Sequence, residues 1–254
     1  MIFQTEGIVL KSVDYGESHK IVHILTPMQG RVSIMAMGAK KTNSKFAALT
    51  QPFVMSEFVL YKKPSSLGRI NQSEIISSFG GIREDLLLSA YAMYICDLSD
   101  RVVEEMEPVP EMYALVKAIL TMINVRSHDP EILTRIFEVK LFDLRGYRPN
   151  FEQCMHCCTH DSTYTSYMFS AKLGGFLCKS CRQEDARAIP ISPTTAKLLR
   201  VFQYIKLEDI GKISIKQQYR QELEAVTQNF IEEHFALQLK SFKFVQSVKS
   251  MYDL

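Results

Sequence analysis

Two Cys-x-x-Cys pairs are the residues of this chain whose types and spacing are most typical of a chemical site. Cys154 and Cys157 form the first pair, and Cys178 and Cys181 follow after a spacer of twenty residues. A two-residue spacer lets one turn direct both sulfurs at the same metal ion, and Zn²⁺ takes four such ligands at about 2.3 Å. Because four thiolates leave no open position for water, we expect a structural zinc ion rather than a catalytic one.

Neighbouring side chains leave the ligand set open to other choices. His156, Cys158 and His160 crowd the first pair, and each has an atom able to replace one of the four sulfurs. Cys96 lies in an apolar run, where a small buried side chain is its expected role. A disulfide framework is the alternative for the cysteines, but residues 1–11 carry a charge and no long apolar segment of the secretory kind. We therefore expect a cytoplasmic protein with reduced thiols.

The composition fits a globular protein without a membrane segment. The chain has 254 residues, of which 46% are hydrophobic, and a formal net charge of +2. Its nearest approach to a membrane span, residues 86–96, is far shorter than the roughly 18 residues required. Charge is uneven, since residues 1–80 hold nine Lys and Arg against five Asp and Glu, whereas residues 81–150 hold eight against twelve. This uneven distribution of charge indicates that the two segments have different functions.

Residues 1–80 have the pattern of a small all-β unit. Five runs rich in β-branched and aromatic residues are separated by segments with the Gly, Pro, Asp and Ser typical of turns. The expected strands are 6–11, 20–26, 31–37, 53–61 and 69–77. Their number and length predict a five-stranded Greek-key barrel of the OB type.

From residue 81 onward, apolar residues recur at helical spacing. Asp129-Pro130 and Ser192-Pro193 each combine a capping side chain with proline at the first helical position. The expected helices are 82–105, 111–124, 130–144, 193–202, 216–239 and 241–252. The predicted fold class is a multidomain α+β protein, with the barrel at 1–80 and a mainly α-helical domain at 81–254 that carries an inserted zinc module at 149–190.

The sequence contains no recognisable catalytic motif, and we expect a protein that is not an enzyme. The phosphate-binding loop of nucleotide hydrolases is absent, and Glu232-Glu233-His234 lacks the second His of a His-Glu-x-x-His zinc site. His19 and His23 share one face of an expected strand, where we interpret them as polar residues on an exposed sheet surface rather than as metal ligands.

Basic residues concentrate at the strand ends and in one long loop of the expected barrel. Lys and Arg neutralise phosphates and give salt-sensitive binding, and exposed aromatic rings stack on unpaired bases. Tyr15 and Phe46 lie in polar loops and are the candidate stacking residues, whereas Phe53, Phe58 and Tyr61 are more typical of a core. The candidate nucleic-acid-binding cations are Lys11, Lys20, Arg31, Lys40, Lys41 and Lys45.

Several short motifs occur in a specific order along essentially the whole chain. They are Glu6-Gly7-Ile8-Val9-Leu10, Asp14-Tyr15-Gly16-Glu17, Thr26-Pro27 with Gly30, Gly38-Ala39-Lys40-Lys41, Gln51-Pro52, Gly81-Ile82-Arg83-Glu84-Asp85 and Gly146-Tyr147-Arg148-Pro149. In this order they resemble the RecO family of bacterial recombination mediators. The two cysteine pairs match the zinc-containing branch of that family.

This resemblance implies a non-enzymatic protein of DNA repair and homologous recombination in the RecF pathway, and hence of the DNA-damage (SOS) response. Members bind single- and double-stranded DNA, anneal complementary strands, and help load the recombinase onto strands coated by single-strand-binding protein. The implied partners are RecR and the C-terminal tail of the single-strand-binding protein, and the implied location is the cytoplasm, at the bacterial nucleoid.

The resemblance also suggests roles for individual residues. By position, Lys40, Lys41 and Lys45 become phosphate contacts in the long loop of the barrel. Where the family often has Arg, this chain has Lys40, which keeps the charge but not the planar fork. The basic candidates for the pocket that receives the tail are Arg126, Arg135, Lys140 and Arg200.

Two other classes of function stay open from the residues alone. A zinc-ribbon factor acting in transcription or on RNA would prefer structured RNA or a specific duplex sequence. A metal-dependent hydrolase would need an open coordination position, which four thiolate ligands exclude.

Overall fold

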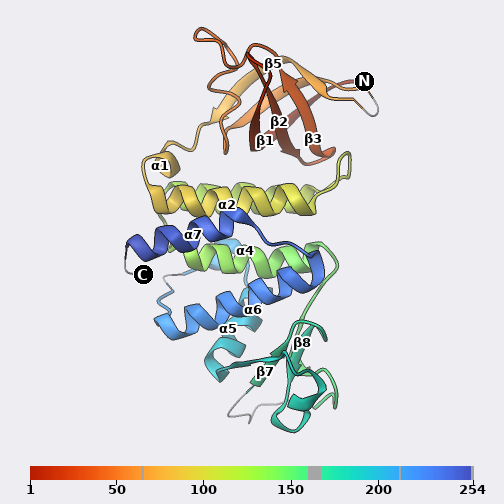
Figure 1. Cartoon of the computed structure of the whole chain (residues 1–254), viewed down its shortest axis with the longest axis vertical. Helices are drawn as coiled ribbons and strands as arrows, with labels where there is room; N and C mark the ends of the chain where they lie inside the picture. Colours follow the sequence, from red (N-terminus) through yellow and green to blue (C-terminus); the bar gives the residue numbers. More distant parts are fainter. Residues whose placement is uncertain (64–65, 160–166, 212, 253–254) are drawn as a thin grey trace. The chain divides into compact units, whose positions relative to one another are not determined.

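The computed structural model describes residues 1–63, 66–159, 167–211 and 213–252 of the chain (Figure 1). The chain divides into two compact units. The first comprises Met1–Pro130 together with Leu239–Leu254, and the second comprises Glu131–Gln238. In sequence, the second unit is therefore inserted between two parts of the first.

A closed five-stranded barrel forms the amino-terminal part of the first unit, and its strands occur at the five expected places. They are β1 (Ile2–Tyr15), β2 (His19–Thr26), β3 (Gly30–Ala36), β4 (Met55–Tyr61) and β5 (Gly68–Ser77). Their order around the barrel is β1-β2-β3-β5-β4. The long strand β1 closes the barrel, because its first half pairs with β4 and its second half with β2. This is the predicted barrel of the OB type.

The core of the barrel follows from the alternation of side chains along its strands. In β3, Val32, Ile34 and Ala36 are buried, and the residues between them are half-buried. Phe58 and Leu60 of β4 reach the same core. Strand positions two apart point to the same face, so the β-branched residues seen in the sequence meet inside the barrel.

The described residues of the first unit also form four helices. They are α1 (Gly80–Arg83), α2 (Leu86–Val102), α3 (Pro110–Asn124) and α7 (Lys240–Met251). The single helix expected at 82–105 is wrong, because Asp85 has an extended backbone and its side chain accepts hydrogen bonds from the amides of Leu87 and Leu88. This N-cap starts α2 and leaves α1 as a separate turn.

α7 lies against α2, far from it in sequence. The ring of Phe242 is 5.5 Å from that of Tyr94, and the Ser241 hydroxyl donates to Asp97 Oδ2 at 2.6 Å. The sequence predicts one helical domain at 81–254, whereas the compact units assign α1, α2, α3 and α7 to the same unit as the barrel. The reason is burial, because α2 contacts both β1 and α7.

The second unit combines three longer helices with a small sheet. The helices are α4 (Pro130–Leu144), α5 (Pro193–Tyr204) and α6 (Gln217–Phe235), with the 3₁₀ turns η1 (Lys179–Glu184) and η2 (Leu207–Asp209). The sheet has the order β6-β8-β7-β9 and lies within the module expected at 149–190, apart from the last residue of β9. Its strands are β6 (Asn150–Cys154), β7 (Tyr167–Ser170), β8 (Gly175–Leu177) and β9 (Ile189–Ile191).

Aromatic packing joins the sheet and the helices of the second unit. Phe230 of α6 lies 4.4 Å from Phe142 of α4 and 6.3 Å from Phe169 of β7, measured between ring centroids. α5 starts as expected, with the Ser192 side chain accepting from the Thr195 amide. None of the helices in the described part of the chain combines the length and the hydropathy needed to cross a bilayer.

Candidate metal centre and nucleic-acid interface

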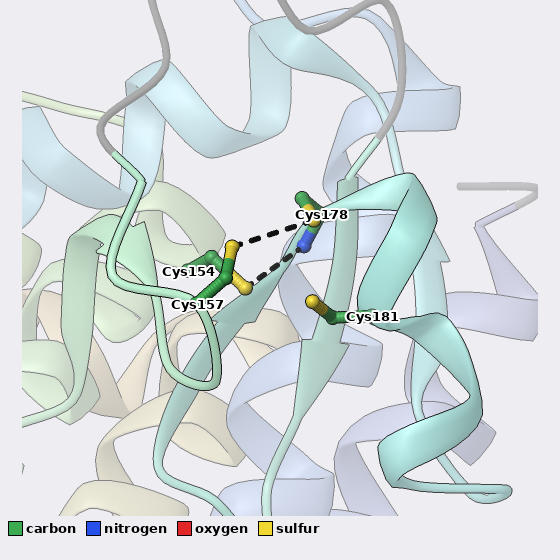
Figure 2. A group of neighbouring side chains, drawn as sticks. All are labelled: Cys154, Cys157, Cys178 and Cys181. Carbon is green, nitrogen blue, oxygen red and sulfur yellow. Dashed lines mark hydrogen bonds between the residues drawn. The ribbon is translucent and has the colours of Figure 1, made fainter.

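The sulfur atoms of the two Cys-x-x-Cys pairs converge on one point of the second unit (Figure 2). The ligand atoms of Cys154, Cys157, Cys178 and Cys181 all lie within 4.8 Å of one another. The distance between Cys157 Sγ and Cys178 Sγ is 3.8 Å. Four sulfurs placed tetrahedrally at about 2.3 Å from a metal are separated by about 3.8 Å, so this pair already has the spacing of a zinc site.

Two strands of the small sheet place the cysteine pairs side by side. Cys154 ends β6 and pairs with Phe176 of the parallel strand β8, and Cys178 follows the end of that strand. The Cys178 amide lies 3.4 Å from Cys154 Sγ and donates to it. The chain turns at each pair, since the Cys181 amide donates to the Cys178 carbonyl at 3.0 Å and the Cys158 amide donates to the Cys154 carbonyl at 2.9 Å. The sheet thus positions the four sulfurs.

The chemistry of these thiols fits a bound cation. The hydroxyl and the amide of Thr159 lower the pKa of the Cys157 thiol to about 6. Burial, together with hydrogen bonds from the neighbouring cysteines, raises the pKa of Cys181 to about 12. Four sulfurs this close repel one another as thiolates unless a dication lies among them. The cluster therefore suits a metal ion with soft ligands and no open position.

Two of the alternative ligands, Cys158 and His156, lie outside this cluster. Cys158 is exposed, with a left-handed backbone (φ 57°), and is not one of the four converging residues. His156 instead has Nδ1 3.5 Å from a carboxylate oxygen of Glu184. His160 falls outside the described residues. Cys96 is buried as expected, and burial raises its pKa.

The long loop after β3 and the turn after β1 meet at one end of the barrel. The Lys40 amide donates to the Ser18 carbonyl at 3.1 Å, and the Gly38 amide donates to His19 Nδ1 at 3.0 Å. Lys40 Nζ forms an ion pair with Asp14 at 2.9 Å, and this hydrogen bond lowers the pKa of Asp14. The structure thus brings Lys40 to the end of β1, and Lys41 and Lys45 are exposed in the same loop.

The two candidate stacking residues differ in their environment. Tyr15, at the end of β1, is 50% exposed. Phe46 is partly buried against the barrel core, with Lys45 Nζ 5.1 Å from its ring centroid. Tyr15 therefore has a ring available to a ligand, whereas Phe46 packs partly buried against the barrel core. Phe53 and Phe58 are buried, as expected for core residues.

The remaining predicted cations of the barrel lie on its strands. Lys20 is half-buried, and its charge contributes to the low pKa of Asp14. Lys11 pairs in register with His23 and contributes to the low pKa of Asp100. Neither side chain is as exposed as those of the loop.

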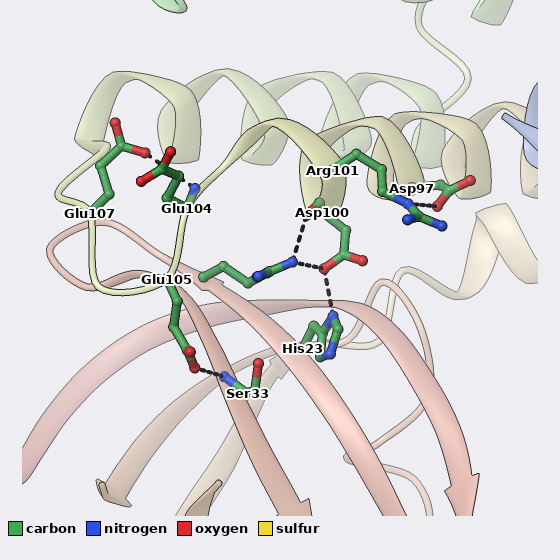
Figure 3. Close-up of polar contacts among 9 residues, drawn as sticks. His23, Ser33, Asp97, Asp100, Arg101, Glu104, Glu105 and Glu107 are labelled. Carbon is green, nitrogen blue, oxygen red and sulfur yellow. Dashed lines mark hydrogen bonds and ion pairs between the residues drawn. The ribbon is translucent and has the colours of Figure 1, made fainter. Parts of the chain in front are cut away.

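Arg31 faces α2 rather than the barrel end that carries the lysines. Its Nη1 donates to the carbonyl of Asp100 at 3.0 Å and lies 3.6 Å from the carboxylate of the same residue. His23 Nδ1 is 2.6 Å from that carboxylate, which is only 2% exposed (Figure 3). Arg31 of β3 and His23 of β2 therefore hold two barrel strands to the helix. The interpretation of His23 as a residue of an exposed sheet face is wrong, because the α2 carboxylate covers it.

The sequence gives little indication that Asp100 is buried and contacts the barrel. It is an acidic residue in the apolar register of a helix, next to Ser99 and Leu98, which are also buried. A buried carboxylate requires a charged or hydrogen-bonding partner, but the sequence does not say which one. The partners come from strands that are more than 60 residues away.

The four candidates for a partner pocket lie in different local environments. Arg126 is exposed and lies 3.6 Å from Asp85. Arg135 is 1% exposed and forms an ion pair with Glu138 at 3.2 Å, so it is part of the core of the second unit. Lys140 is half-buried, and burial lowers its pKa. The Arg200 guanidinium donates to the Phe151 carbonyl and lies over two aromatic rings.

Two protein-family models match the chain, and the boundary between them falls at the end of the barrel. The model of the recombination protein O N-terminal family matches residues 1–79, and that of the recombination protein O C-terminal family matches residues 83–243. The chain belongs to the RecO family. The resemblance inferred from the motifs is therefore confirmed over nearly the whole chain.

Relatives with high identity extend over the full length. The DNA repair protein RecO of Bacillus subtilis is 41% identical over 254 residues, which cover 100% of this chain and 98% of the relative. The RecO protein of Bacillus pumilus is 39% identical, and the match covers 100% of this chain and 97% of the relative. The RecO protein of Listeria monocytogenes serotype 4b is 36% identical, and the match covers 96% of this chain and 93% of the relative.

Proposed function

We propose that this chain is a non-enzymatic mediator of DNA repair and homologous recombination. RecO family membership supports the role in repair and recombination. The mediator binds single- and double-stranded DNA, anneals complementary strands, and helps load the recombinase onto strands coated by single-strand-binding protein. RecR and the C-terminal tail of the single-strand-binding protein are the proposed partners, in the bacterial cytoplasm at the nucleoid.

The observation that carries this proposal is that Lys40 of the long loop pairs with Asp14 near the end of β1, the strand that Tyr15 ends with a half-exposed ring, while Lys41 and Lys45 are exposed in the same loop. The ion pair between Lys40 and Asp14 lies at the surface, with 31% and 63% of the two side chains exposed. Exposed pairs of this kind contribute little to stability because solvent screens them, so a phosphate group displaces Asp14 at little cost. The three ammonium groups then contact the backbone while Tyr15 stacks on an unpaired base.

Annealing follows from charge screening at this surface. Two complementary strands repel each other through their phosphates, and bound lysines replace the counterions that would otherwise be condensed on each strand. Held at low repulsion, the strands sample base pairing until a matched segment forms. The protein breaks no covalent bond in this process.

We further propose that the four cysteines bind a structural Zn²⁺ ion. Their sulfur-only donor set and tetrahedral spacing support this choice of metal. The ion would brace β6 and β8 against each other. Because no coordination position is left for water, it would not supply hydrolytic chemistry.

Fluorescence anisotropy with labelled single strands tests the DNA-binding surface. Replacing Lys40, Lys41 and Lys45 by Ala should weaken binding at least tenfold and lower the steepness of the salt dependence by about one unit for each phosphate that the variant no longer neutralises. The matched control replaces three exposed lysines of the second unit, Lys172, Lys206 and Lys216. Equal affinity of the two triple variants, or affinity insensitive to salt, would contradict the proposed surface.

A strand-annealing assay tests the activity itself. Complementary strands coated with single-strand-binding protein should pair faster when the full chain is added, and the triple lysine variant should lose this acceleration. Binding of DNA without any acceleration of pairing would reject the annealing role. A clear preference for structured RNA would instead favour a zinc-ribbon factor acting on RNA.

A further inference from the structure

β5 has one edge that is largely without a neighbouring strand. β4 pairs with it from Arg69 to Ser77, but β3 pairs with it only at Gly68 and Arg69. Within the described ranges, no backbone hydrogen bond joins residues 71–76 to a segment on that open side. Residues 71–76 are exposed along their whole length. The edge thus presents free amide and carbonyl groups to solvent.

This edge lacks two of the residue types that usually prevent strand addition, since residues 71–76 contain neither lysine nor proline. Its protection consists of Glu74 and of two register shifts against β4, between Met55 and Ser56 and between Val59 and Leu60. Between these shifts the pairing is regular, and near its end Ile75 is 44% exposed and Ile76 is 48% exposed. An open edge with exposed apolar side chains is the feature by which domains bind an additional strand from a partner.

A row of three glutamates crosses the sheet beside this edge. Glu6 of β1 is opposite Glu57 of β4, which is opposite Glu74 of β5. Residues directly opposite point to the same face, where like charges destabilise the pairing. Glu6 is compensated, because Lys117 Nζ and the Tyr113 hydroxyl each lie 2.6 Å from its Oε1.

The other two glutamates of this row have no such compensation. No ion pair of Glu57 or Glu74 occurs in the part of the chain that the structure describes. Between them lies a groove of about 340 Å³, lined also by Gln4, Val59 and Gln72. Its carboxylates repel phosphate, so this groove suits a cationic ligand and not a nucleic acid. The contact of Glu6 with Lys117 shows that an ammonium group would neutralise the carboxylates of this groove.

We propose that the open edge of β5 docks an extended cationic segment of a partner protein. The segment adds a strand along residues 71–76 and places a Lys or Arg side chain beside Glu57 and Glu74. Alternate side chains point to opposite faces, so the positions of the segment between its cations carry apolar residues on the face of Ile75, the residue that follows Glu74. Backbone hydrogen bonds supply affinity, and the carboxylates select the cationic face.

A labelled peptide of alternating Lys and Val is the probe for this edge. Its binding to the full chain is measured by fluorescence anisotropy at moderate salt. The double variant Glu57→Gln with Glu74→Gln should bind it about tenfold more weakly, and Glu74→Gln alone about threefold more weakly. The double variant removes a like-charge pair, so its thermal midpoint should equal or exceed that of the parent, which separates lost binding from unfolding.

Two controls distinguish strand addition from general attraction between charges. A protein control, Glu17→Gln with Glu84→Gln, removes two exposed carboxylates elsewhere in the first unit and should bind the probe like the parent. A peptide control of equal charge has proline in place of the central valines and should not bind, because proline cannot donate to the ladder. Equal binding of the two peptides, or equal loss in both double variants, would overturn the proposal.

Discussion

At the scale of single residues, Asp100 shows how a buried charge is held in this protein. Burial by itself raises the pKa of its carboxyl group, but the hydrogen bond from His23 and the charges of His23, Arg31 and Lys11 outweigh burial. The pKa therefore lies below its ordinary value. The charged form is favoured because two strands of the barrel supply its partners.

The first prediction concerns Asp100→Asn. The amide keeps the shape but loses the charge that His23 and Arg31 contact, so the free energy of unfolding should fall by about 1–3 kcal/mol at neutral pH. A carboxyl with a lowered native pKa stabilises the fold fully above its unfolded pKa of about 3.9, and this contribution disappears as the pH falls through the native pKa. Urea titrations between pH 7 and pH 3 should therefore show a steeper loss of stability in the parent than in the variant. Parallel curves would show that Asp100 does not contribute in this way.

The second prediction compares two glycines with similar backbone angles. Gly30 has φ +55°, and a Cβ atom there would lie 2.2 Å from the carbonyl oxygen of Glu107, whereas Gly16 has φ +59° and open space around it. Gly16→Ala should cost about 1–2 kcal/mol from the left-handed backbone alone. Gly30→Ala should cost clearly more, because the segment after α2 must move. Thermal denaturation of both variants measures the difference, and equal costs would argue against the close approach.

Contacts between individual side chains were the hardest feature of the molecule to predict from the sequence. The sequence places Arg31 among the phosphate-binding cations and Arg135 among the partner-binding ones, since both lie in segments with suitable charge. Arg31 is engaged by Asp100, and Arg135 is buried beside Glu138. Only the three-dimensional position of a distant carboxylate decides whether an arginine reaches solvent.

At the scale of elements, the small sheet of the second unit depends on its cysteine pairs. β6 and β8 pair at Asn150 with Gly175 and at Cys154 with Phe176. So few backbone contacts give little stability without further support. A metal ion bound by Cys154, Cys157, Cys178 and Cys181 would join both strands and the turn that follows β8.

The third prediction is that Cys154→Ser abolishes zinc binding and Cys158→Ser does not. Elemental analysis should find one zinc per chain in the parent and in the Cys158 variant, and none in the Cys154 variant. Loss of the ion should lower the thermal midpoint of the second unit, because structural zinc contributes folding free energy directly. Full zinc content in the Cys154 variant would show that another side chain takes its place.

Local patterns allowed most elements to be predicted. Alternating β-branched residues marked all five barrel strands, and the Ser192-Pro193 cap marked the start of α5. The four short strands of the second unit were not predicted, because three to five residues give too little periodicity. The break at Asp85 was also missed, since the apolar spacing continues through it.

At the scale of the whole molecule, the first unit is completed by residues from both ends of the sequence. Tyr94 and Asp97 of α2 contact Phe242 and Ser241 at the start of α7. Amphipathic spacing predicts both helices but not their mutual contact, because pairing of distant helices depends on the packing of the complete fold.

The fourth prediction is that deletion of residues 239–254 destabilises the first unit. The deletion uncovers α2, including the ring of Tyr94, and should cost about 3 kcal/mol or more, by analogy with the loss of large buried side chains. Hydrogen exchange should accelerate in α2 and leave the strands around the cysteines of the second unit protected. Unchanged protection of α2 would show that α7 is dispensable.

The position of α7 also has a consequence for the order in which the protein forms. A ribosome releases the barrel strands and α2 first, but the surface of α2 that α7 covers stays bare until Lys240–Met251 has emerged. Residues 131–238 are complete before that moment and are free to fold as a unit during translation. Nascent chains arrested before residue 240 should therefore expose an apolar stripe on α2, which makes this interval the time when chaperone protection matters most.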